Sequence, residues 1–81
     1  MEITVRLFAL AKQLASDDTL VVSVPAPGTV GDVRRAIGEE CPALKGLMGQ
    51  MLIAVDSEYA QDETPVNALS EVACIPPVSG G

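Results

Sequence analysis

The sequence has 81 residues, of which 48% are hydrophobic, so it predicts one small globular domain and argues against disorder. Its net charge is −6, and this acidic balance argues against nucleic-acid binding, because a phosphate backbone needs clustered Lys and Arg. Histidine is absent and the two cysteines lack metal-ligand spacing, so neither a histidine-assisted nucleophile nor a metal site is expected.

The first quarter of the chain predicts a strand, a connection and a second strand. Residues 2–8, EITVRLF, alternate between apolar and polar positions, which is typical of a half-buried strand. Phe8 falls on the polar side of this strand. Residues 9–16 predict a short helix, and residues 19–24, TLVVSV, alternate again.

One main helix follows the turn at residues 25–29, PAPGT. Thr29 is a suitable N-cap, and Asp32 stands three residues later, where a carboxylate favours the positive end of a helix. Apolar residues then recur at helical spacing from Val30 to Cys41, and Pro42 is expected to end the helix.

The second half predicts a loose helical turn, a buried strand, a short edge strand and a last strand. These lie at residues 43–49, at 51–56, near Tyr59 and at 71–75. Pro76 and Pro77 end the last strand, since proline cannot donate to the ladder. In the connection before it, Val66 and Leu69 are expected to pack beneath the sheet.

This order of elements predicts an α+β domain, with one mixed sheet of about five strands covered on one face by the main helix. It matches the β-grasp architecture, in which the first and last strands lie side by side at the centre. Residues 1–76 are assigned to the domain and residues 77–81 to a flexible C-terminal tail.

The ends and the thiols indicate a cytoplasmic protein. Glu2 follows Met1 directly, the apolar stretch LFALA is too short for a signal sequence, and no run is long enough to span a membrane. Cys41 and Cys74 are expected to be reduced, small buried residues.

Acid–base chemistry has little support within the chain. The carboxylate pairs Glu39-Glu40 and Asp62-Glu63 are adjacent in sequence, which is typical of a solvated surface, and no glycine-rich phosphate loop is present. The chain alone is therefore not expected to be an enzyme. Its acidic second half fits docking onto a basic protein surface, or it only aids solubility.

The sequence ends in IPPVSGG, which directs attention to the terminal carboxylate. Gly80 and Gly81 have no Cβ, so this tip can pass through a narrow channel and place its carboxylate at a distant reactive centre. The carboxylate is inert until ATP converts it to an adenylate. Pro77 favours an extended stem, while Val78 and Ser79 are read as spacer or anchor.

A tail of this kind needs a docking surface on the domain. Ordering it in a channel costs about 1–2 kcal/mol of backbone entropy per residue, and contacts elsewhere must offset that cost. Phe8 and Ile75 are the candidate partner contacts, because the first and last strands should be neighbours. The alternatives are that Phe8 is a core residue at a strand end and that Ile75 only packs in the core.

Three stretches resemble the family of molybdopterin synthase small subunits. These are EVACIPPVSGG at the end, VRLFALAKQLA near the start and IAVDSEY in the middle. The chain departs from that family's usual pattern at Asp56, where Asn is usual, and at Ser70, where Asp is common. It also departs at Cys74 and Ile75, whose sites are often aromatic or larger aliphatic in the family.

The resemblance implies a ubiquitin-like β-grasp sulfur carrier. Gly81 would be adenylated by a partner similar to ubiquitin-activating enzymes, which uses ATP, and then converted to a thiocarboxylate. The tail would enter the active site of the large synthase subunit and give sulfur to a cyclic pyranopterin precursor. The family's assembly has two large and two small subunits, and the small subunit binds no cofactor.

Three other functions remain open on sequence alone. The chain could carry sulfur for another acceptor, as in thiamine or amino-acid sulfur transfer. It could be a ubiquitin-like modifier that forms isopeptide bonds with lysines. It could also be a binding module whose tail has no role.

Overall fold

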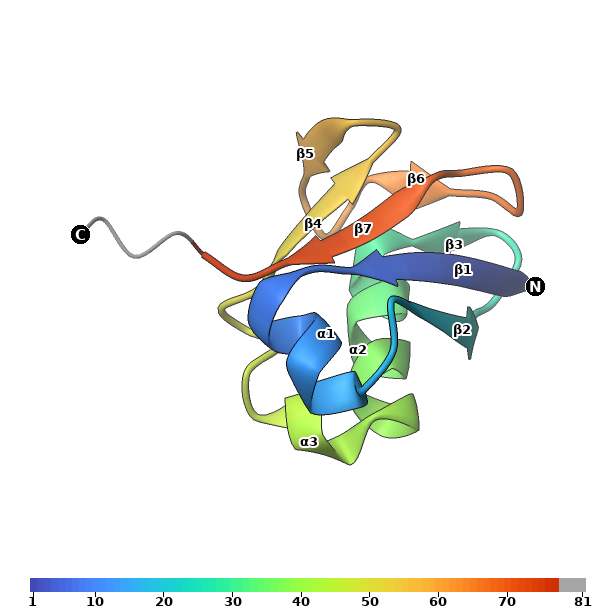
Figure 1. The fold of residues 1–81 in the computed structure, drawn as a ribbon. Helices are drawn as coiled ribbons and strands as arrows, with labels where there is room; N and C mark the ends of the chain where they lie inside the picture. Colours follow the sequence, from blue (N-terminus) through green and yellow to red (C-terminus); the bar gives the residue numbers. More distant parts are fainter. Residues whose placement is uncertain (78–81) are drawn as a thin grey trace.

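The computed structural model describes residues 1–77. Within them, the elements in chain order are β1 (Glu2–Leu7), α1 (Ala9–Ala15), β2 (Thr19–Ser23), β3 (Gly28–Thr29), α2 (Val30–Glu40), α3 (Pro42–Lys45), β4 (Leu52–Val55), β5 (Glu58–Ala60), β6 (Pro65–Val66) and β7 (Val72–Ile75). Figure 1 shows their arrangement, with the three helices on one side of the main sheet.

The main sheet has five strands in the order β2-β1-β7-β4-β5. Strands β1 and β7 are parallel neighbours, with Val5 opposite Val72 and Leu7 opposite Cys74, and the other pairs are antiparallel. The first and last strands therefore lie side by side in the sheet, as predicted. This mixed sheet with helices on one face is the β-grasp fold.

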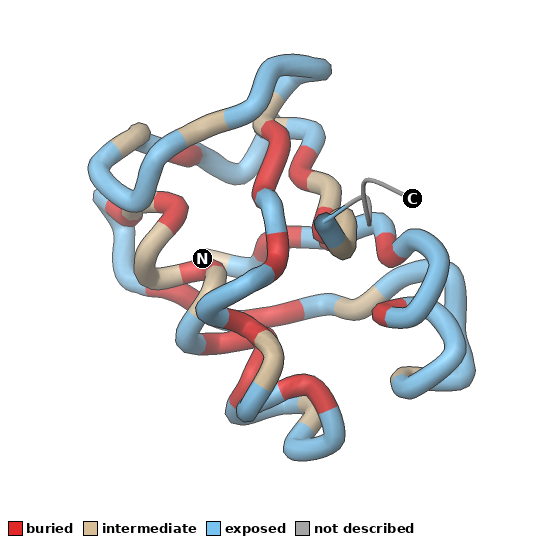
Figure 2. Tube along the Cα trace, turned by 90° about the vertical axis from the view of Figure 1, so that its left-hand side faces the viewer, coloured by how far each residue is buried: buried red, intermediate tan, exposed pale blue. Residues whose placement is uncertain are grey.

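Alternation along the strands produces the core. In β1, Ile3, Val5 and Leu7 are buried, whereas the residues between them are exposed. These side chains pack with the apolar side of α2, including Val33 and Ile37, into one cluster. Figure 2 marks the buried positions along the trace. The core is aliphatic, as the shortage of aromatic residues requires.

The main helix has a capped start and a defined end. Thr29 and Asp32 form a capping box, in which the Thr29 N–H donates to the Asp32 carboxylate at 3.0 Å and the Asp32 N–H donates to the Thr29 hydroxyl at 3.4 Å. The helix ends at Glu40. Pro42 then opens α3 at its first turn, where its missing N–H costs nothing.

Arg34 ties α2 to two loops. Its guanidinium donates to the carbonyl oxygens of Met48 and Met51, the latter at 2.7 Å, and its Nε donates to the carboxylate of Asp62 at 3.0 Å. A cation that satisfies buried carbonyls in this way holds the irregular segment between α3 and β4 against the helix.

A second, two-stranded sheet was not predicted from the sequence. Strand β3 pairs with β6, so that Gly28 lies opposite Val66 and Thr29 opposite Pro65. At Gly28 an added Cβ would lie 2.6 Å from the carbonyl oxygen of Pro25, which explains the glycine there. The pairing places the start of α2 beside the β5–β7 connection.

The expectation that Val66 and Leu69 both pack beneath the sheet is half wrong. Val66 is buried, but Leu69 is 91% exposed. The backbone N–H groups of Asn67 and Leu69 bond to the Ser70 hydroxyl at 3.0 Å and to the Asn67 side-chain oxygen at 2.8 Å. The backbone N–H groups of this turn are therefore satisfied by side chains of the turn itself. The turn does not need Leu69 in the core to hold its shape.

Among residues 1–77, no helix combines the length and the apolar character that crossing a membrane requires.

Candidate functional site: an open sheet face beside the C-terminal tail

The helices lie on one side of the main sheet, and within residues 1–77 its other side carries no helix (Figure 1). We call this other side the open sheet face. It is built from the strand positions that alternate with the core positions, so the sequence period that fills the core also sets which side chains face outward.

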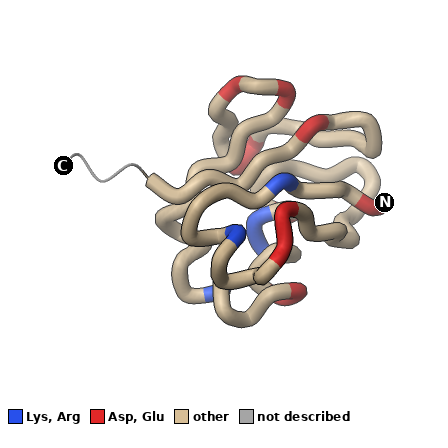
Figure 3. The backbone as a smooth tube through the Cα atoms, viewed as in Figure 1, with Lys and Arg blue, Asp and Glu red and all other residues tan. Residues whose placement is uncertain are grey.

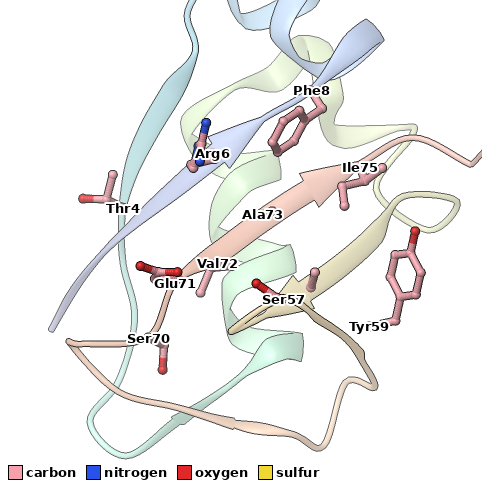
Figure 4. A pocket seen from close by; sticks show the side chains of 11 residues that line it. Thr4, Arg6, Phe8, Ser57, Tyr59, Ser70, Glu71, Val72, Ala73 and Ile75 are labelled. Carbon is pink, nitrogen blue, oxygen red and sulfur yellow. The ribbon is translucent and has the colours of Figure 1, made fainter.

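The open sheet face contains a hollow of about 590 Å³. It lies over β7, the central strand, and Figure 4 shows the side chains around it. The residues that line it are Thr4, Arg6, Phe8, Ala54, Ser57, Tyr59, Ser70, Glu71, Val72, Ala73 and Ile75. We refer to this set as the hollow.

Phe8 follows β1 directly and lies at the rim of the hollow. Its N–H donates to the carbonyl of Cys74 at 3.2 Å, which extends the pairing between β1 and β7 by one bond. The ring remains 40% exposed. The alternative that Phe8 is a core residue at a strand end is therefore wrong, and the residue is available for contact with another molecule.

Ile75 and Phe8 line the same hollow, as the predicted adjacency of the first and last strands requires. Ile75 is half-buried, at the end of β7 and opposite Leu52 of β4. It is therefore not fully withdrawn into the core. The structure brings these two candidate partner contacts together, while their contact with a partner stays a prediction.

Tyr59 is a further candidate that the sequence interpretation left without a role. It lies on β5, opposite Ala54 of β4. Its side chain lines the hollow and is 70% exposed. Tyr and Phe are among the residues enriched at protein interfaces. The available signal was composition, since Tyr59 and Phe8 are the only aromatic residues of the chain.

The C-terminal tail begins where β7 ends. Pro76 is half-buried and Pro77 is exposed, at the same end of β7 as Ile75. The predicted tail residues Val78, Ser79, Gly80 and Gly81 lie outside the described residues. The hollow therefore adjoins the start of the segment to which the sequence assigns the reactive end.

Charge is distributed unevenly around the sheet (Figure 3). The five cations lie on β1, α1, α2 and α3, and only Arg6 among them lines the hollow. Its guanidinium carbon lies 5.5 Å from the centre of the Phe8 ring, within the range of a cation–π contact. Among the described residues, Glu71 is the one acidic residue that lines the hollow.

The described thiols offer no nucleophile at the hollow. Cys74 is buried on the core side of β7, and this burial raises the pKa of its thiol to about 11. The thiol therefore stays protonated at neutral pH. Cys74 agrees with the prediction of a small buried residue, whereas Cys41, at the end of α2, is only half-buried.

The carboxylate pairs behave as surface residues. Glu39, Glu40 and Glu63 are exposed, and Asp62 is also exposed but pairs with Arg34. Within residues 1–77, most side chains that line the hollow are apolar or neutral, and both carboxylate pairs lie outside it.

Known proteins resemble this chain over nearly its whole length. The model of the ThiS family matches residues 5–81. A protein of Caenorhabditis briggsae named molybdopterin synthase sulfur carrier subunit is 37% identical, over 100% of this chain and 99% of its own length. A protein of the same name from Arabidopsis thaliana is 32% identical, over 100% of this chain and 84% of its own.

Solved structures show the same fold. The crystal structure of SAMP1 from Haloferax volcanii has a TM-score of 0.88 and 29% identity, and the match covers both chains completely. A chain in the complex of subunits 1 and 2 of the molybdopterin-converting factor from Helicobacter pylori has a TM-score of 0.68 and 26% identity, again over both full lengths.

Proposed function

Because the chain belongs to the ThiS family, we propose that it is the sulfur-carrier subunit of a molybdopterin synthase. The observation that carries this proposal is the full-length similarity, at 31–37% identity, to four curated relatives that share that name. The match extends across the β-grasp domain and the C-terminal tail together.

The proposed chemistry takes place at Gly81. A partner enzyme similar to ubiquitin-activating enzymes binds ATP and transfers AMP to the terminal carboxylate, releasing pyrophosphate. A sulfur donor then displaces AMP from the mixed anhydride, which leaves a thiocarboxylate. That sulfur passes to the cyclic pyranopterin precursor, where two such sulfurs form a dithiolene, and water returns the tail to the carboxylate.

The domain supports this chemistry by docking. Phe8, Ile75 and Tyr59 present an apolar area next to the start of the tail, so binding there would offset the entropy lost when the tail is ordered. The residues that act on the pyranopterin would belong to the partner. The Helicobacter pylori structure is a complex of subunits 1 and 2, which supports a large-subunit partner for this fold.

The partners follow from the same proposal. The large synthase subunit takes up Pro77, Val78, Ser79, Gly80 and Gly81 in its active site, in an assembly of two large and two small subunits. In this proposal the ATP is bound by the activating enzyme, so the carrier needs no cofactor of its own, and residues 1–77 contain no cluster of His, Cys, Asp and Glu that could hold a metal ion.

The test is the mass of the intact protein after incubation with ATP, the activating enzyme and a sulfur source. We expect one terminal oxygen to be replaced by sulfur, and the product to give dithiolene when the large subunit and the precursor are added.

Deletion of Gly81 should abolish both the mass change and dithiolene formation, because the new terminus is displaced by one residue and the reacting carbonyl no longer reaches the same place. The core lies within residues 1–77, so thermal unfolding should not change. Dithiolene formation by the truncated protein would refute the proposal.

A second candidate, a ubiquitin-like modifier, is favoured by one observation. The neighbour with a TM-score of 0.88 is SAMP1, and a further solved structure, 27% identical to this chain, is that of small archaeal modifier protein 1 from Haloferax volcanii. In this function the same adenylate would react with a lysine amine to give an isopeptide. Conjugates that survive denaturation and thiol in cells would support it, and a fully unconjugated pool would exclude it.

A further inference from the structure

The hollow has two chemically different ends. Near the start of the C-terminal tail it is apolar, where Phe8, Ile75 and Tyr59 converge (Figure 4). Farther from the tail it is polar and carries one charge of each sign, on Arg6 and Glu71. A partner that covers the hollow therefore meets a fixed direction, and its own side chains must match that direction.

Arg6 has no ion-pair partner within residues 1–77. The ion pairs there are Lys12 with Asp18 at 2.7 Å, Arg34 with Asp62 at 3.0 Å, and Arg35 with Asp32 at 3.5 Å. Glu71 lines the same hollow but forms no ion pair with Arg6. The positive charge of Arg6 also acts on Asp18, but the Asp18 carboxylate is bound to Lys12. That bond is the main cause of the lowered pKa of Asp18.

The guanidinium of Arg6 does have one contact within the domain, the aromatic ring of Phe8. It lies 5.5 Å from the centre of the Phe8 ring, and the Phe8 backbone is fixed by its bond to Cys74. A planar arginine fork that contacts an aromatic ring is partly pre-organised, so less side-chain entropy is lost when it meets a carboxylate. The contact also places the cation directly beside the candidate interface residue.

Burial of the Arg6 guanidinium under a partner is unfavourable unless the partner replaces the hydrogen bonds that the guanidinium makes with water. If an apolar partner surface closed over the hollow, it would remove water from a charged group without replacing its hydrogen bonds, which is strongly unfavourable. A carboxylate is the group that satisfies an arginine fork with two parallel hydrogen bonds. Acidic residues outnumber cations in this chain, which has a net charge of −6, so a cation in the hollow without an ion-pair partner among the described residues is an unusual feature of its surface.

We propose that the partner covering the open sheet face supplies an Asp or Glu whose carboxylate pairs with Arg6. This partner is the large synthase subunit, so the inference rests on the proposed function. The partner segment then has a defined order: an apolar side chain sits among Phe8, Ile75 and Tyr59, and the acid lies beside it, farther from the tail. Arg6 is thus a specificity-determining residue of the interface, not a catalytic one.

The experiment measures the Kd between the intact carrier and the large subunit. Arg6→Gln removes the charge and should weaken binding about 10-fold or more, as loss of one member of a covered charge pair does. Arg35→Gln is the matched control: it removes the same group from an exposed site on α2, and it should change Kd less than about 2-fold. Equal Kd values for the two variants would overturn the inference.

Two further variants define the chemistry. Arg6→Glu sets two carboxylates against each other and should weaken binding about 100-fold, more than Arg6→Gln. If one partner Asp or Glu is the counter-ion, changing that residue to Arg should restore binding to Arg6→Glu but not to the wild type. A full scan of acidic residues on the partner that yields no such rescue would refute the carboxylate. Arg6 is exposed, so circular dichroism should show each variant folded.

Sulfur transfer by the wild type separates this inference from the proposed function. If wild-type carrier binds the large subunit but gives no dithiolene, the proposed function fails while the Arg6 comparison still stands. If dithiolene forms and Arg6→Gln binds as well as the wild type, only the inference fails. Absence of any binding by the wild type would overturn both.

Discussion

The two faces of the main sheet use the same strands for different purposes. On β4, Ile53 is 1% exposed and faces the core, whereas its neighbour Leu52 is 39% exposed and faces outward. On β7, Cys74 is buried and Ile75 lines the hollow. Adjacent residues of one strand therefore contribute to different free energies: the buried one to the free energy of folding, and the outward-facing one to the free energy of binding a partner.

This difference follows from the period of two in a strand. The core side is packed by helices and loses its contact with water during folding. The open sheet face keeps apolar side chains partly in water, where they contribute little to the stability of the free protein but can contribute to a complex. Substitutions on the two faces should thus separate into two classes, which the following predictions test in order of decreasing effect.

The largest expected effect is on the core side. Ile53→Ala should lower the free energy of unfolding by about 3–4 kcal/mol, because it removes buried methylene groups and leaves a cavity. Urea denaturation measures the change. Leu52→Ala is the matched control one residue away, where side-chain exposure limits the loss to about 1 kcal/mol. Equal losses would show that the open sheet face is not free in solution.

Local signals account for the parts of the fold that the sequence predicted. Alternation in residues 2–8 identifies β1, and Thr29 with Asp32 identifies the start of α2, because both signals act between residues close in the chain. The neighbouring positions of β1 and β7 were predicted from the order of elements, and with them the joint position of Phe8 and Ile75 at one site.

Contacts between distant segments explain what the sequence did not predict. Strand β3 is two residues long and exists only because Val66 and Pro65 lie beside it, so no periodicity could reveal it. Leu69 is apolar and was assigned to the core, but the hydrogen bonds of its turn decide its position. The place of Tyr59 at the hollow depends on the pairing of β5 with β4, which a short edge strand does not encode strongly.

The next prediction concerns the open sheet face. Tyr59→Ala should weaken binding of the large subunit by about 2 kcal/mol, the scale of an aromatic interface residue. Its free energy of unfolding should change by about 0.5 kcal/mol or less, because the side chain is mostly in solvent. Isothermal titration calorimetry and thermal unfolding measure the two quantities on the same variant.

Val21→Ala provides the control for Tyr59. Val21 is exposed on β2 and lies opposite Thr4, so it belongs to the same sheet face but does not line the hollow. Its substitution should leave the partner affinity nearly unchanged. If both variants weaken binding equally, the interface extends over the whole face rather than over the hollow.

The smallest effect is expected in the β4–β5 turn, which bounds the hollow through Ser57. Asp56 and Ser57 have φ values of 51° and 71°, a conformation that strains residues with a Cβ and that glycine adopts freely. Ser57→Gly should therefore raise the free energy of unfolding by about 0.5–1 kcal/mol, measured by urea denaturation. Asp56 keeps the turn in place, since its carboxylate accepts from the Glu71 N–H at 3.0 Å.

Ser57→Ala separates strain from side-chain chemistry in this turn. It removes the hydroxyl but keeps the Cβ, so it should not stabilise the fold as Ser57→Gly does. If the turn only supports the hollow, both variants should bind the large subunit as the wild type does, and stability and affinity would again vary independently. A loss of affinity shared by Ser57→Ala and Ser57→Gly would instead make the Ser57 hydroxyl part of the interface, and a gain in stability shared by both would show that backbone strain is not its source.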